Sequence, residues 1–286
     1  MSGLDLSAKF GRTVPDGRSL DPGLFADGSP AGGEIVEIVG DSNCGKSCLI
    51  LELIAKIILP VNCGGHAAGA VFVNCDNNIN LVYLLNIMEK QIVNCTIPAN
   101  KTIDRIEIER IRQESFSRLT MIKCCTMDEF EFSFLTLNEL FAENHLNKYL
   151  LIDSVVAFYW SKCTETNLIR MDTYIKLLYR RLRRLCRDRN IAAICTRPLH
   201  FVSGNRESVT TEFDDSAEVN SLSSITRSMS STNKINNTSI EHRIELAEVV
   251  SLTPNDDVKF NAFVTSNGKQ MIKFFAIDKY GINWLN

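Results

Sequence analysis

The sequence has no C-x-x-C pair and only four histidines, although ten cysteines occur among its 286 residues. The clustered cysteine and histidine ligands of a zinc site are therefore not expected. The polar first twenty residues lack the apolar stretch of a signal peptide, and no apolar run is long enough to span a membrane. We therefore expect a reducing compartment, in which most of the thiols are buried as small hydrophobic groups.

A strong excess of positive charge is also missing, because the formal net charge is −3. Contact with DNA therefore has to come from a local patch or from a partner. One basic helix is predicted over 168–188, in which Arg180, Arg184 and Arg187 share a face. That face is either a solvated helix surface or a contact for phosphates or an acidic partner. The buried side of the same helix is predicted to consist of Leu177, Leu178, Leu182 and Leu185.

What the chain does contain is a match to the phosphate-binding P-loop pattern G-x-x-x-x-G-K-[ST]. An apolar, β-branched run precedes the match at 34–39, and an apolar helical run follows it at 47–59. A strand, a glycine turn and a helix N-terminus form an anion site, because backbone N–H groups and the helix dipole face the phosphates. We expect Lys46 to reach the β- and γ-phosphates of ATP and Ser47 to bind Mg²⁺. The complete predicted ATP-binding loop is Gly40, Asp41, Ser42, Asn43, Cys44, Gly45, Lys46 and Ser47.

A second signal of a nucleotide site is the apolar strand that ends at Asp153. In P-loop ATPases such a carboxylate lies beside the P-loop serine and holds the Mg²⁺ ion. Asp76 ends the next strand after the P-loop helix and is either the acid that orients the attacking water or an Asx-turn cap. The strand at 191–196 leads into no Gln or Asn that senses the γ-phosphate, which leaves Thr196 or Arg197 as substitutes. ATP binding is therefore more strongly indicated than hydrolysis.

The order of patterns along the chain predicts an α/β fold with a mostly parallel central sheet and helices on both faces. The expected strands are 34–39, 70–75, 119–125, 149–153 and 191–196, and the expected helices lie near 47–59, 79–94, 127–144 and 168–188. Further β-like runs at 243–250, 258–264 and 271–277 are expected to add antiparallel strands at the C-terminal end.

Three segments stand apart from this alternation. Residues 1–30 are expected to form a flexible N-terminal arm before a core of residues 31–286. Within the arm, Phe25 and Ala26 either anchor a partner or pack onto the domain's own sheet. Residues 97–117 indicate a helical or loop excursion. The Ser/Thr/Asn-rich insertion at about 203–240 is expected to be disordered.

Several phrases of the sequence resemble the RecA-type recombinases, and more narrowly the recombinase paralogues. They are GDSNCGKS at 40–47, LFADGSP at 24–30, LIDS at 151–154, AFYW at 157–160 and FFAI at 274–277. The resemblance implies a RecA-like ATPase core that binds Mg²⁺ and ATP through the P-loop, Ser47 and Asp153, with Asp76 as the displaced catalytic acid. Active recombinases have Glu as that acid and a Gln after the strand at 191–196. The two departures imply that hydrolysis is weak or absent.

The same resemblance implies a role in homologous recombination repair of DNA double-strand breaks in the nucleus. Such paralogues are accessory subunits that assist the strand-exchange recombinase. The implied partner is another RecA-type recombinase paralogue in a multi-subunit complex, through which DNA is contacted. The insertion at 203–240 falls where the family's second DNA-binding loop lies. Two alternatives remain open: a free-standing P-loop NTPase or kinase, and a degenerate RecA-fold scaffold that does not need nucleotide.

Overall fold

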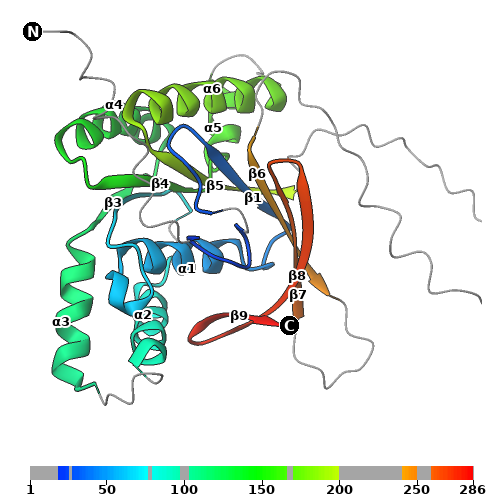
Figure 1. The fold of residues 1–286 in the computed structure, drawn as a ribbon. Coiled ribbons are helices and arrows are strands. Elements are labelled where there is room, and N and C mark those ends of the chain that lie inside the picture. Colours follow the sequence, from blue (N-terminus) through cyan, green and yellow to red (C-terminus); the bar gives the residue numbers. More distant parts are fainter. Residues whose placement is uncertain are drawn as a thin grey trace, which may run out of the picture.

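The computed structural model describes residues 19–25, 28–76, 79–96, 103–165, 170–199, 240–249 and 259–285. Its strands form one sheet in the order β3-β2-β4-β5-β1-β6-β7-β8-β9 (Figure 1). Neighbours from β3 through β6 run parallel, and neighbours from β6 through β9 run antiparallel. The predicted α/β fold with antiparallel C-terminal strands is therefore confirmed. The strands are β1 (Ile35–Gly40), β2 (Gly69–Asn74), β3 (Leu119–Lys123), β4 (Asn147–Asp153), β5 (Ala192–Pro198), β6 (His242–Val249), β7 (Lys259–Ser266), β8 (Lys269–Asp278) and β9 (Gly281–Leu285).

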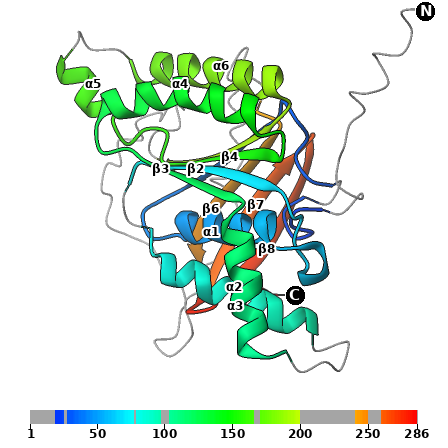
Figure 2. The ribbon, with the colours of Figure 1, turned by 90° about the vertical axis from the view of Figure 1, so that its left-hand side faces the viewer.

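Helices cover both faces of this sheet (Figure 2). One face carries α1 (Lys46–Ile58), α2 (Leu81–Thr96) and α3 (Arg105–Phe116), with the short 3-10 helix η1 (Val61–Cys63) between α1 and β2. The other face carries α4 (Met127–Glu143), α5 (Tyr159–Glu165) and α6 (Met171–Arg189). Two apolar cores result, one on each side. The core on the α1 side extends under β7, β8 and β9.

Burial explains why the centre of the sheet forms as it does. Every residue of β1 and β2 is buried, as expected for parallel strands that are covered on both faces. Nine of the thirteen residues of α1 are buried, so this helix is a core helix and its apolar sequence needs no polar face. The P-loop between β1 and α1 is therefore held between two immobile elements.

The C-terminal strands differ from the prediction in two respects. The run predicted at 243–250 forms β6, which pairs parallel with β1 and only then antiparallel with β7. β9 was not among the predicted strands, because it has only five residues and begins directly after the turn at Lys279 and Tyr280. The excursion predicted at 97–117 contains α3. The insertion predicted at 203–240 lies, apart from Ile240, outside the described residues.

Part of the predicted N-terminal arm packs onto the body of the domain. Leu20, Leu24 and Phe25 are buried in the core on the α1 side. The carboxylate of Asp21 pairs with the ammonium group of Lys56 on α1. For Phe25, packing onto the domain's own sheet is the correct alternative, whereas Ala26 and residues 1–18 lie outside the described residues.

Candidate nucleotide site

The P-loop has the shape that its two glycines permit. A Cβ atom on Gly40 would lie 2.3 Å from Sγ of Cys44 and 2.6 Å from the carbonyl oxygen of Leu246 on β6. Gly45 has a φ of +90°, and a Cβ atom there would lie 2.6 Å from Cδ1 of Ile277 on β8. Only glycine fits both positions. The wall of the P-loop therefore includes strands from the far end of the chain.

The ammonium group of Lys46 bends back over this loop. Its Nζ donates hydrogen bonds to the carbonyl oxygen of Gly40 at 3.0 Å and to that of Asp41 at 2.6 Å. Asp41, Ser42 and Asn43 are exposed, so the tip of the loop is open to a ligand. Phosphate oxygens are charged acceptors and bind an ammonium group more strongly than carbonyl oxygens do. Lys46 can therefore exchange its present acceptors for a phosphate.

Asp153 ends β4 and carries a buried oxygen that lacks a partner. The side chain is only 2% exposed. Its Oδ1 accepts a hydrogen bond from the hydroxyl of Thr196, whereas Oδ2 has no hydrogen-bond partner among the described residues. Leaving a buried carboxylate oxygen unsatisfied is costly, and a hard cation or its water ligand removes that cost. The carboxylate of Asp153 and the hydroxyl of Ser47 are oxygen donors of the kind that Mg²⁺ prefers, so the residues present fit this ion.

The donor set further suggests that the ion depends on the nucleotide. Within the described part of the chain, no group of three or more His, Cys, Asp or Glu side chains is arranged to hold a metal. Mg²⁺ typically binds through one or two carboxylates and completes its shell with waters and substrate phosphates. The single carboxylate of Asp153 and the hydroxyl of Ser47, as the donors available, match that pattern.

Asp76 lies next to Asp153 because the ends of β2 and β4 are tied together. The backbone N–H groups of Cys75 and Asp76 donate to the carbonyl oxygen of Asp153, at 2.7 and 3.1 Å. Partial burial and the negative charge of Asp153 raise the pKa of the Asp76 carboxyl, and the ammonium group of Lys46 opposes this rise. Asp76, Asp153 and Lys46 thus influence one another at a single edge of the sheet. Asn77 and Asn78, which would complete an Asx turn, lie outside the described residues.

The two residues considered as γ-phosphate sensors point to opposite faces of β5. Thr196 reaches the nucleotide site, where its hydroxyl donates to Asp153. Arg197 is buried on the α6 side, and its Nε donates to Oε1 of Glu37 at 2.7 Å. Arg197 therefore does not face the phosphates. Sequence reasoning could not separate the two, because the strand alternation decides which one faces α1.

Glu37 on β1 is the centre of a buried ionic network that sequence reasoning missed. It accepts hydrogen bonds from the hydroxyl of Tyr179 at 2.7 Å, from Arg197 and from Nη1 of Arg243 at 3.3 Å. Burial alone would raise the pKa of Glu37, but the charges of Arg197 and Arg243 hold it below its usual value. The signal for this network in the sequence was the charged residue Glu37 in the interior of the apolar run at 34–39.

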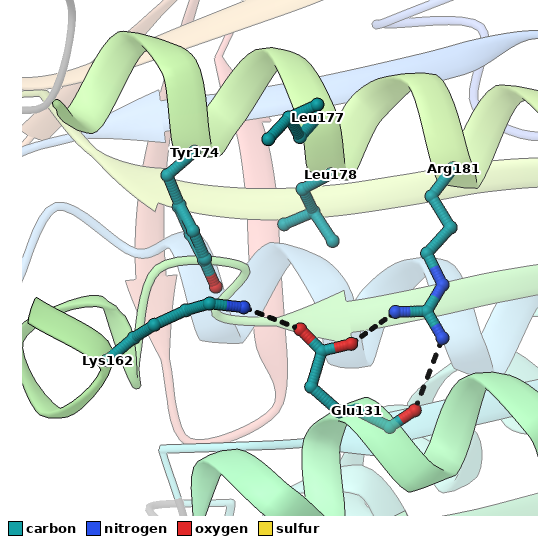
Figure 3. A pocket seen from close by; sticks show the side chains of 6 residues that line it. All are labelled: Glu131, Lys162, Tyr174, Leu177, Leu178 and Arg181. Carbon is teal, nitrogen blue, oxygen red and sulfur yellow. Dashed lines mark hydrogen bonds and ion pairs between the residues drawn. The ribbon is translucent and has the colours of Figure 1, made fainter. Parts of the chain in front are cut away.

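A separate pocket lies on the opposite face, between α4, α5 and α6 (Figure 3). Its cavity of about 130 Å³ is lined by Glu131, Lys162, Tyr174, Leu177, Leu178 and Arg181. Glu131 lies between the two cations, and its Oε1 accepts from Nζ of Lys162 at 3.0 Å.

Leu177 is 52% exposed, so its predicted place on the buried side of the helix is wrong. The other three leucines predicted for that side are buried.

Large apolar side chains are exposed on the three helices that line this pocket, and we call them the α4–α6 apolar face. It consists of Phe132 and Leu135 on α4, Trp160 on α5 and Leu177 on α6, all more than half exposed. Lys176, Arg180, Arg184 and Arg187 are exposed along α6. Among the helices that the structure describes, none has the length and hydropathy that a membrane crossing needs.

Comparison with known proteins finds a similarity to a curated DNA repair protein. No family model matches the chain. DNA repair protein XRCC2 of Mus musculus is 27% identical over 164 residues, which cover 56% of this chain and 53% of the relative. The match thus spans about half the length of that curated protein. In sequence, the chain resembles DNA repair protein XRCC2, and its α/β fold, parallel at the centre and antiparallel at the C-terminal end, is that of a RecA-like core.

Proposed function

We propose that this chain is an ATP- and Mg²⁺-binding accessory subunit of a recombinase-paralogue complex in the nucleus. In this role it acts in homologous recombination repair of DNA double-strand breaks and assists the strand-exchange recombinase. The similarity to DNA repair protein XRCC2 supports the repair part of the proposal. The nucleotide part is carried by one observation, the buried Oδ2 of Asp153, which has no hydrogen-bond partner among the described residues.

Nucleotide binding follows from what the chain's own groups do. The P-loop N–H groups and Lys46 bind the phosphates, while Ser47 and Asp153 hold the metal. A bound Mg²⁺ would supply positive charge that neutralises part of the phosphate charge. Among the described residues, Asp76 lies near Asp153 and could orient a water, but its side chain is shorter than that of glutamate. We therefore propose that binding rather than turnover is the function of the site.

Equilibrium binding of a fluorescent ATP analogue to the full chain tests this part. Lys46→Ala and Asp153→Asn should each raise the dissociation constant about 10-fold or more, as expected for loss of a charged partner. Lys176→Ala is the matched control, because this exposed lysine lies on α6, on the opposite face of the sheet. Equal affinity in all four proteins would contradict nucleotide binding at this loop and favour the scaffold alternative.

A partner surface is suggested by the α4–α6 apolar face. Four large apolar side chains, all more than half exposed on three neighbouring helices, are characteristic of a protein–protein contact. The exposed cations of α6 would favour an acidic segment on the partner. We propose that another RecA-type paralogue binds here and that DNA is reached through the assembled complex.

Affinity purification of the tagged protein from nuclear extract, followed by mass spectrometry, tests the partner. Recombinase paralogues in near-stoichiometric amount are expected with the unmodified chain and should be lost with Leu135→Glu combined with Leu177→Glu. Ile272→Glu is the matched control, since Ile272 is 54% exposed on β8, away from this face. A protein recovered alone that hydrolyses ATP in vitro would instead establish the free-standing NTPase.

A further inference from the structure

Two cysteines lie side by side at the edge of the nucleotide site. Cys75 directly follows β2 and Cys124 directly follows β3, and the last paired residues of these parallel strands are Asn74 and Lys123. The N–H group of Cys124 continues this ladder by donating to the carbonyl oxygen of Asn74 at 3.0 Å. The two cysteines therefore occupy directly opposed positions on neighbouring strands.

Their side chains also point the same way. Both belong to the apolar core on the α4–α6 side of the sheet, and the two thiols are hydrogen-bonded to each other. Neighbouring strands are spaced by about 4.8 Å, and a disulfide spans Cα atoms about 4.4–6.8 Å apart. Only a small rotation of the side chains is needed to bring the two sulfur atoms into bonding distance.

The pair is coupled to the nucleotide site by the backbone. The N–H groups of Cys75 and Asp76 both donate to the carbonyl oxygen of Asp153. A covalent bond between Cys75 and Cys124 replaces two independently rotating side chains with one rigid link, which changes the backbone conformation at the end of β2. It thereby alters the position of Asp76 relative to Asp153.

We infer that Cys75 and Cys124 form a peroxide-sensitive dithiol pair, oxidation of which closes a disulfide and weakens nucleotide binding. In the first step one sulfur attacks hydrogen peroxide, the O–O bond breaks, and a sulfenic acid and one water are formed. In the second step the other thiol attacks that sulfur, an S–S bond forms, and a second water leaves. Two thiols lose two electrons and two protons in total, and peroxide takes them up. A thiol reductant reverses the reaction.

Access to the pair is from the carboxyl-terminal edge of the sheet. Cys75 is 5% exposed and Cys124 is fully buried, but the adjacent Asp76 and Cys125 are exposed. Burial of the pair therefore limits access for a small oxidant such as peroxide less than for a bulky alkylating reagent. The remaining cysteines provide an internal comparison in the same experiment.

The test begins with the native full chain, treated with hydrogen peroxide, denatured, alkylated and digested. Mass spectrometry should find a peptide pair joined through Cys75 and Cys124 with the loss of two hydrogen atoms, and dithiothreitol should abolish it. Cys124→Ser and Cys124→Ala should both remove the linked pair. Both thiols alkylated after peroxide treatment, or Cys75 linked to Cys125 instead, would overturn the inference.

The effect on the nucleotide rests on the proposed function and is measured separately. The dissociation constant for the ATP analogue should rise about 5-fold or more on oxidation of the unmodified chain, and should stay unchanged for Cys124→Ala. A linked pair without a change in affinity would overturn the coupling. If the reduced protein binds no nucleotide, the proposed function fails, while the linked peptide still decides whether the thiols pair.

Discussion

The hydroxyl of Thr196 donates a hydrogen bond to the carboxylate of Asp153, and thereby joins the end of β5 to the end of β4. A backbone hydrogen bond also connects the two strand ends, because the N–H group of Val155 donates to the carbonyl oxygen of Thr196 at 3.1 Å. One oxygen of Asp153 is thus occupied by a neighbour in the protein. Only the other oxygen is available to a cation.

Removing that hydroxyl should affect both stability and metal binding. Thr196→Val leaves the buried Asp153 carboxylate with no hydrogen bond to its side chain, which should cost about 1–3 kcal/mol of unfolding free energy. Urea denaturation measures this cost. Thr196→Ser keeps the donor and is the matched control. The same loss in both variants would show that packing of the threonine methyl group, rather than its hydrogen bond, is what matters.

Replacement of Gly45 by a larger residue should destabilise the fold for two separate reasons. Gly45→Ala introduces a positive-φ strain and a contact with Ile277, so we expect a loss of about 1–3 kcal/mol in unfolding free energy. Adding Ile277→Ala should remove the contact but not the strain. A double-mutant cycle measures the difference. Strict additivity of the two changes would contradict the close approach of β8 to the P-loop.

The buried and the exposed ionic networks should respond very differently to loss of their carboxylates. Glu37→Gln leaves Arg197 buried without its counter-charge, which should destabilise the fold by about 3–5 kcal/mol. Glu131→Gln, in the surface pocket, should cost about 0–1 kcal/mol. Chemical denaturation of both variants gives the comparison. Similar losses would mean that burial does not govern the strength of these pairs.

Glu52 on α1 should destabilise the fold at neutral pH. Burial raises the pKa of its carboxyl group, despite the charge of Lys56 and the hydrogen bond from Gln91. A carboxyl group that holds its proton more tightly in the folded state favours folding at low pH and opposes it as the pH rises above 4.5. Glu52→Gln should therefore be more stable than the unmodified chain at pH 7, with a gain that disappears in acid.

Glu37 should change the stability of the fold with pH in the opposite direction to Glu52. Its pKa is lowered, so its contribution to stability is present above its unfolded value and is lost as the pH falls. Thermal unfolding of the unmodified chain and of Glu52→Gln across a pH series separates the two groups. A gain from Glu52→Gln that is the same at every pH would exclude ionisation as its cause.

The sequence was sufficient for the parts of the fold that depend on local pattern. β1, α1 and β4 are short, strongly apolar segments with clear ends at glycine, proline or aspartate, and each was predicted close to its observed limits. The juxtaposition of Asp76 and Asp153 was accessible too, because parallel strands present their carboxyl ends at one edge.

What could not be predicted depends on contacts between distant segments. The network around Glu37 forms only in the folded chain, because Arg197, Tyr179 and Arg243 lie on three other elements. Leu177 has the spacing of a core residue, yet it projects beyond the contact of α6 with the sheet. Such assignments require the three-dimensional arrangement of the helices.

The approach of β8 to the P-loop has a genetic consequence. A frameshift or stop codon after β6 would leave Gly40 through Ser47, Asp76 and Asp153 unchanged in the gene product. The truncated chain would nevertheless lack Ile277, against which Gly45 rests, and the N–H group of Ile282, which donates to the buried Glu52 at 3.4 Å. Truncations that begin after every nucleotide-binding motif are therefore expected to cause loss of function.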